Sequence, residues 1–187
     1  MRRDQEIIDF WFSSEARSHW FKSTDRFDGQ VREKFETTAI ALAAGMQAGR
    51  GSYADWEDRP DSALALIIAL DQFPRNMYRG TPAAFAWDPL ALTAARRAVE
   101  RGHDLKLGQD RRPFAYMPFM HAEDLEAQER CVSLCDSRLK DDTIKHAITH
   151  RDIIARFGRF PHRNDVLGRV TTPEEQDYLD NGGFNPT

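Results

Sequence analysis

An all-α fold is predicted for this chain of 187 residues by three features of its sequence. Ala is frequent, with 22 residues against only 5 of Val, and no run of β-branched residues alternates as a half-buried strand would. Apolar residues instead recur every three or four positions, the period of a helix with one buried face. Residues that start and stop helices bracket these segments. We therefore expect about seven antiparallel helices, joined by short loops, in a single domain spanning residues 1–187.

The first half of the chain predicts helices around one apolar centre. Asp4 is expected to cap a first helix, and Asp28 a longer one that stops at Gly45. Residues 62–70 are apolar on every side, which predicts a buried central helix. Pro74 should end that helix, because the residue before a proline is pushed away from the helical region.

The second half predicts four more helices. We expect Asp88, which precedes a proline, to cap the first of them, and the others to begin at or near His121, Asp141 or Asp142, and Thr172. Gly158 is the expected stop of the third. The fourth begins with a capping box, because Thr172 is followed three residues later by Glu175, with a proline between them at the first helical position.

Composition and charge exclude several classes of protein. The 26 Lys and Arg residues and the 30 Asp and Glu residues give a net charge of −4. We therefore expect no extended basic surface that binds nucleic acid. No apolar stretch approaches the roughly 20 residues that span a bilayer, so we expect no membrane partner. Two cysteines cannot form a secreted disulfide framework, and no signal-peptide core follows the first residues. These features predict a cytoplasmic protein without a cofactor, and they make no prediction of its oligomeric state.

Two arginine-rich segments predict an anion site. Arginine is over-represented, with 21 residues against 5 of lysine, and its planar fork binds carboxylate and phosphate. Each segment follows an apolar helix and carries a Phe-Pro pair, at Phe73-Pro74 and Phe160-Pro161. The candidate ligand-binding residues are Arg75, Asn76, Arg79, Arg156, Arg159, Arg163 and Asn164. The alternative is that these arginines cap helix C-termini and pair with Asp71, Asp88, Glu123 or Asp124 in a structural network.

Histidines supply the candidate titrating groups of this site. They are His121, His150 and His162, with Glu123 and Asp124 as carboxylates that would set their orientation. Asp71 is a carboxylate at the end of an apolar helix, which predicts a salt bridge with the nearby arginines. His146 and His150 are four residues apart on one helix, the spacing of a metal-ligand pair, but no glutamate lies between them as in a zinc-protease motif.

Four segments carry a resemblance to a known family. They are residues 9–12, 64–80, 117–124 and 150–169, and together they extend the match over nearly the whole chain. The chain resembles the bacterial domain-of-unknown-function family nine-two-four. This resemblance implies an all-helical fold of stacked helix pairs similar to tetratricopeptide-repeat proteins. The family has no established activity, so the resemblance implies no catalytic residues. Many members have Ser where this chain has Ala122, which argues against a nucleophile at that position here.

Three functions fit these residues. The first is a pocket for a small anionic ligand, either as a binding protein or as an enzyme, which requires the two arginine segments to meet in space. The second is a helical scaffold that binds a peptide or a partner protein in a groove. The third is a metal-dependent hydrolase that uses His121, His146 or His150 with nearby carboxylates.

Overall fold

The computed structural model describes residues 2–20, 22, 24–51 and 53–185. These residues form α-helices and short 3₁₀-helices and contain no strand, which confirms the all-α prediction. The described α-helices are α1 (Arg3–Trp11), α2 (Ser14–Arg17), α3 (Asp25–Gln47), α4 (Tyr53–Trp56), α5 (Pro60–Met77), α6 (Asp88–Glu100), α7 (Arg112–His121), α8 (Leu125–Arg138), α9 (Thr143–Phe157) and α10 (Pro173–Asp180). The described 3₁₀-helices are η1 (Pro82–Phe85), η2 (Asp104–Lys106) and η3 (Pro161–Arg163).

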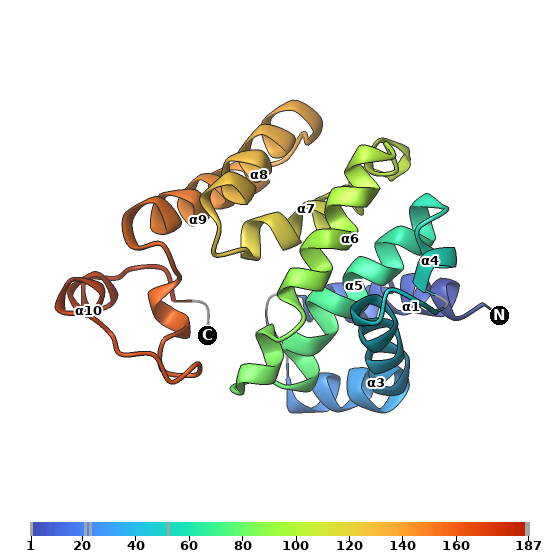
Figure 1. Ribbon diagram of the computed structural model, residues 1–187, viewed down its shortest axis with the longest axis horizontal. Helices are drawn as coiled ribbons and strands as arrows, with labels where there is room; N and C mark the ends of the chain where they lie inside the picture. The colour runs from blue at the N-terminus through green and yellow to red at the C-terminus, as the bar shows by residue number, and fades with distance from the viewer. Residues whose placement is uncertain (1, 21, 23, 52, 186–187) are drawn as a thin grey trace.

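Helix α5 is the centre of the molecule, as the apolar sequence predicts. Every residue from Ser62 to Leu70 is buried. The helix is covered on different sides by α1, α3, α6 and α7, which explains why it has no polar face (Figure 1). Successive long helices pack against one another from α5 through α9. Among the described residues, no helix is long and apolar enough to cross a bilayer.

The prediction that Pro74 ends this helix is wrong. Helix α5 continues to Met77 with Pro74 inside it. Pro74 has no N–H, so one hydrogen bond of the helix is missing. The next turn still forms, because the Tyr78 N–H donates to the Pro74 carbonyl at 2.9 Å. Phe73 and Met77 are fully buried, so tertiary packing compensates for the lost bond.

Three predicted caps are also wrong, for a common reason. Helix α3 is capped by Thr24 four residues before Asp28, and it passes through Gly45. Asp4 and Asp88 lie inside the first turns of α1 and α6 and do not cap them. Their carboxylates accept hydrogen bonds from arginine side chains instead. A charged partner from elsewhere in the fold offers a stronger bond than a local backbone N–H.

Helix α7 was not predicted, and its position changes the reading of His121. This residue is the last of α7, whereas the sequence placed it at a helix start. The following helix, α8, begins four residues later with Asp124 as its N-cap. The stops and starts predicted nearer the C-terminus are confirmed: Gly158 ends α9 with φ of 69°, and Thr172 forms the capping box of α10.

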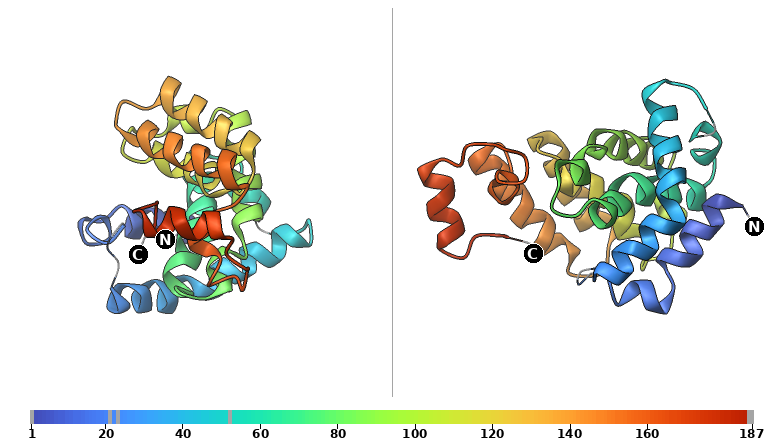
Figure 2. Two further views of the ribbon diagram at one scale, coloured as in Figure 1. Left: turned by 90° about the vertical axis from the view of Figure 1, so that its left-hand side faces the viewer. Right: turned by 90° about the horizontal axis from the view of Figure 1, so that it is seen from below.

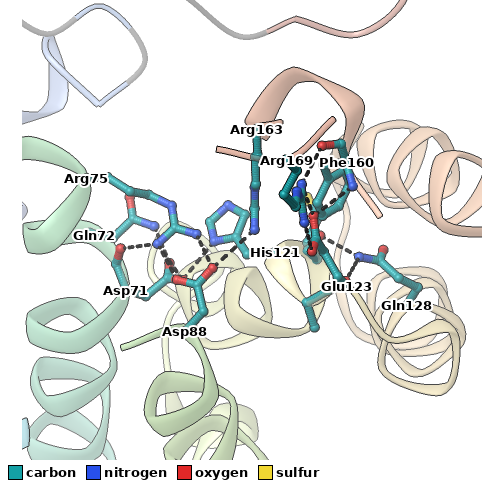
Figure 3. A network of polar contacts seen from close by, with 12 residues as sticks. Asp71, Gln72, Arg75, Asp88, His121, Glu123, Gln128, Phe160, Arg163 and Arg169 are labelled. Carbon is teal, nitrogen blue, oxygen red and sulfur yellow. Dashed lines mark hydrogen bonds and ion pairs between the residues drawn. The ribbon is translucent and has the colours of Figure 1, made fainter. Parts of the chain in front are cut away.

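The C-terminal segment, residues 158–185, stands at one end of the molecule (Figure 2). It contains η3 and α10, and Phe160 packs with Ile153 and Ile154 of α9 in a small apolar cluster separate from the main core. The segment meets the body of the protein where α5, α6 and α7 end or begin, so side chains from four elements meet there (Figures 1 and 3).

Candidate functional site

Arginines from the two predicted segments meet at Asp88. Arg75, near the end of α5, donates to both carboxylate oxygens at 2.9 and 3.0 Å. Arg163 in η3, 75 positions after Asp88, donates to the same carboxylate at 3.3 Å. Figure 3 shows the ring of His121 between the two arginines. We call Asp71, Arg75, Asp88, His121 and Arg163 the junction site.

Asp71 orients the imidazole of His121. The Asp71 side chain is fully buried, and its Oδ1 lies 2.8 Å from His121 Nδ1. An ionised carboxylate only accepts hydrogen bonds, so Nδ1 carries the proton that it donates. Gln72 donates to the other carboxylate oxygen, and Arg75 Nη1 lies 3.4 Å from Oδ1. Within the part of the chain that the structure describes, no group is bonded to His121 Nε2, and the side chain is 18% exposed.

The electrostatics of this pair favour an anionic Asp71 and a neutral His121. Burial opposes the ionised carboxylate, but the charge of Arg75 and the hydrogen bonds from His121 and Gln72 lower the pKa of Asp71 below its usual value. Burial is also the main cause that lowers the pKa of His121, and the charge of Arg75 adds to it, against the opposing effect of Asp71. At neutral pH, His121 is therefore a neutral imidazole with a free Nε2 lone pair.

Arg163 is the most enclosed cation of the junction site. Its side chain is 8% exposed, and its guanidinium lies between the rings of Phe85 and Phe160, at 4.6 and 4.5 Å from their centroids. Burial lowers the pKa of Arg163 to about 10, and Arg75 contributes, so the group stays charged at neutral pH. Its Nε is buried and has no hydrogen-bond partner among the described residues. Such a donor is rare in a folded protein.

Glu123 and Asp124, the predicted orienting carboxylates, have other partners. Glu123 forms a bidentate pair with Arg169 at 2.6 and 3.0 Å and accepts from the Phe160 N–H at 2.8 Å. Glu123 therefore binds two residues of the C-terminal segment and holds that segment beside the junction site (Figure 3). Asp124 caps α8 through the Glu126 N–H and lies 3.5 Å from Arg96. Among the described residues, the carboxylate bonded to His121 is that of Asp71 and not that of Glu123 or Asp124.

His150 and His162 lie among aromatic rings that include Phe160, which also contacts Arg163. His150 contacts Phe160 and Phe184, and its Nδ1 donates to the His146 carbonyl at 2.8 Å. His162 contacts the same two rings, and its Nδ1 is buried without a partner among the described residues. Burial is the main cause that lowers the pKa of His150 to about 4 and that of His162 to about 3, and the charge of Arg163 contributes to both.

The other candidate ligand-binding residues lie outside the junction site. Asn76 and Arg79 both donate to Asp28 of α3. Arg156 pairs with Glu174 at 3.0 Å and lies against the ring of Phe157. Arg159 forms a bidentate pair with Glu175, which also accepts from the buried amide of Asn164. These contacts connect α3 to α5 and hold α10 to the turn before it.

The sequence did not predict all the contacts that Asp71, Phe85 and Phe160 make in this region. It expected Asp71 to pair with an arginine, which Arg75 does, but it did not expect His121 as a partner. Phe85 and Phe160 enclose Arg163, and nothing local to either ring signals that role. The carboxylate within an apolar helix was the signal that could have marked Asp71 as part of a site.

Two open hollows lie away from the junction site. One, of about 460 Å³, lies between α9 and α10 and is bordered by Arg156 and Tyr178. The other, of about 490 Å³, lies at the start of α1 and is bordered by Arg3, Trp56 and Arg59. Within the described residues, no three His, Cys, Asp or Glu side chains are close enough together to hold a metal ion. The described residues therefore do not support the metal-hydrolase hypothesis.

Comparisons with other proteins place the chain in a family. The model of a family described as bacterial protein of unknown function (DUF924) matches residues 7–183. A solved structure titled as a protein of unknown function from Agrobacterium tumefaciens is 44% identical, with a TM-score of 0.86, over 96% of this chain and 97% of that one. No curated protein matches the chain. The family match over almost the whole length means that the chain belongs to the bacterial family DUF924.

Proposed function

We propose that this protein binds a small anionic molecule at the junction site, with Arg75 and Arg163 as the anion-binding residues and His121 as the titrating group. The observation that carries the proposal is the meeting of Arg75 and Arg163 at Asp88, with the free Nε2 of His121 beside them. A guanidinium pair next to an oriented imidazole is the arrangement that anion binding with proton transfer uses.

The charges around Arg163 give a second reason for the proposal. Burying a guanidinium is costly, and each of its buried donors needs an acceptor. The described partners of Arg163 leave Nε without an acceptor, although the side chain is nearly enclosed. An acceptor supplied by a ligand would complete its hydrogen bonding. The opposing consideration is that Asp88 already neutralises part of both arginines, so the site is an anion site of moderate strength.

Asp71 has a distinct part in this proposal. By accepting from Nδ1 it fixes the tautomer of His121 and directs the reactive lone pair to Nε2. This is the carboxylate–imidazole relation that supports general acid–base catalysis in many enzymes. His150 and His162 contact the ring of Phe160 and, in this proposal, support the position of the C-terminal segment rather than contact the anion.

Thermal unfolding in the presence of phosphate, sulfate or succinate tests the proposal. Ionic strength is matched with chloride. A ligand at ten times its Kd stabilises by about 1.4 kcal/mol, which raises Tm by about 3–6 °C for a chain of this size. At least one anion should give this rise in the wild type.

Two arginine variants separate a ligand site from a structural network. Arg163→Ala should remove the rise, whereas Arg130→Ala, at an exposed position of α8, should keep it. If Arg163→Ala lowers the unfolding free energy by about 3–5 kcal/mol and the wild type shows no rise with any anion, Arg163 is only one half of a buried ion pair and the proposal is wrong.

A further inference from the structure

The junction site is balanced in charge when His121 is neutral. Asp71 and Asp88 supply two negative charges, and Arg75 and Arg163 supply two positive charges that pair with them. An additional anion would therefore bring one uncompensated negative charge into a partly buried region, which is unfavourable without a new positive charge.

The hydrogen bond from His121 to Asp71 decides what Nε2 offers to a ligand. Because Nδ1 holds the proton of the neutral ring, Nε2 presents a lone pair. A lone pair repels an anion. When Nε2 is protonated, the same atom becomes a charged donor, and the ring gains one positive charge close to Arg75 and Arg163. One proton on Nε2 thus compensates the charge of the anion and turns Nε2 from an acceptor into a donor.

We propose that the junction site takes up a singly charged anion, such as a carboxylate, together with one proton that resides on His121 Nε2. This inference rests on the proposed function and adds the charge class of the ligand and the proton linkage. A single proton compensates a single charge, so a monoanion fits better than a dianion. The bound complex then holds an imidazolium, so His121 acts on the ligand as an acid.

The groups that face His121 come from every element around it. Asp71 and Arg75 face it from α5 and Asp88 from α6. Arg163 on η3 lies beside the ring (Figure 3), and the charge of His150 on α9 interacts with that of His121. Of these, the carboxylates and guanidiniums keep their charges near neutral pH. His150 is enclosed by rings and donates Nδ1 within its own helix, so His121 is the group positioned to change charge when the anion arrives.

Linkage fixes the sign of the pH dependence. An anion that binds only the imidazolium form must first protonate His121, so its affinity is highest at low pH. Above the pKa of the free site, the association constant falls about tenfold for each pH unit. By reciprocity, the bound anion raises the pKa of His121, by one unit for each tenfold difference between its affinities for the protonated and the neutral ring.

The experiment uses the full chain and acetate as the probe. Acetate is titrated at pH 5.5, 6.5, 7.5 and 8.5 at constant ionic strength, and its Kd is obtained from NMR shifts of amides around the junction site. The imidazole of His121 is titrated with and without saturating acetate. We expect the Kd to rise about tenfold per pH unit over the upper part of this range, and the pKa of His121 to rise when acetate is bound.

Two histidine variants assign the proton. His121→Gln should bind acetate with a Kd that does not change with pH, because the amide of Gln donates at every pH. His146→Gln, at an exposed position on α9, should keep the wild-type dependence. If His121→Gln does not fold, the direct titration of His121 in the wild type decides by itself.

The outcomes distinguish the two proposals. A Kd for acetate that is constant across the pH range, or an unchanged pKa of His121 in the bound form, overturns the proton linkage and leaves anion binding intact. A pH dependence that persists in His121→Gln assigns the proton to another group and also overturns it. The absence of saturable binding of acetate, phosphate and sulfate at every pH overturns the proposed function itself.

Discussion

Asp71 is the residue on which the junction site depends most. Its buried carboxylate accepts from His121 and Gln72 and lies within ion-pair distance of Arg75. The sequence marked Asp71 as unusual, because a carboxylate in an apolar helix needs a partner. It predicted an arginine partner and missed the histidine, since His121 belongs to a helix that the sequence did not reveal.

Replacing Asp71 should be strongly destabilising. Asp71→Asn removes a buried negative charge and leaves Arg75 and His121 partly unpaired, so we expect the unfolding free energy to fall by about 3–5 kcal/mol. Asp152→Asn removes an exposed carboxylate whose one ion pair among the described residues is with its neighbour Arg151, and should cost less than about 0.5 kcal/mol. Urea unfolding at pH 7 measures both. Equal effects of the two changes would contradict the role assigned to Asp71.

At the scale of elements, α7 and α10 show what local sequence does and does not specify. The start of α10 was predicted because Thr172, Pro173 and Glu175 form a complete local signal, and the structure contains both capping-box bonds. Helix α7 has Pro113 in its first turn and Pro118 inside it. Because an internal proline disfavours a helix, the sequence does not predict α7. Burial of most of its residues stabilises it instead.

The capping box of α10 gives a prediction of moderate size. Thr172 accepts from the Glu175 N–H at 3.2 Å, and Glu175, which also binds Arg159, accepts from the Thr172 N–H at 2.8 Å. Thr172→Ala should lower the unfolding free energy by about 1 kcal/mol, whereas Thr172→Ser should restore most of it. Thr149→Ala, on an exposed surface of α9, is the control and should change little. Urea midpoints of the four proteins test this, and an unchanged midpoint in Thr172→Ala would refute it.

At the scale of the whole molecule, the C-terminal segment is attached to the body through charge pairs and through His150 and His162, which lie among aromatic rings. Arg163 and Arg169 reach Asp88 and Glu123 across the contact (Figure 3). His150 supports the segment from α9 through Phe160 and Phe184. This attachment contains little of the apolar packing that surrounds α5, so it should respond to pH more than the main core does.

Mild acid should therefore destabilise the protein. The pKa values of His150 and His162 in the folded state, about 4 and about 3, lie below the usual 6.5, so the unfolded chain binds protons first. Both rings are neutral at pH 7 in either state, and stability is lost as pH falls below about 6.5. Between pH 7 and 5 we expect a loss of about 1–3 kcal/mol.

A substitution in the aromatic cluster identifies the source of this loss. His150→Phe keeps a ring against Phe160 and Phe184 and removes one titrating group, so its stability should fall less steeply between pH 7 and 5. His146→Gln should follow the wild type, since that side chain is exposed. Urea unfolding at five pH values measures the slopes. Parallel slopes for wild type and His150→Phe would exclude His150 as a contributor.

The sequence by itself determined the helical class, the buried α5, the end of α9 and the start of α10. These features depend on periodicity, glycine conformation and side chains within a few positions of one another. Only the tertiary structure decided that Asp4 and Asp88 accept from arginines instead of capping helices, and that Asp71 holds His121. Charged side chains take the partner that packing brings within reach, and Asp88 and Arg163 are brought together from 75 positions apart. No local sequence pattern predicts the contact between Asp88 and Arg163, because it results from the packing of all the helices between them.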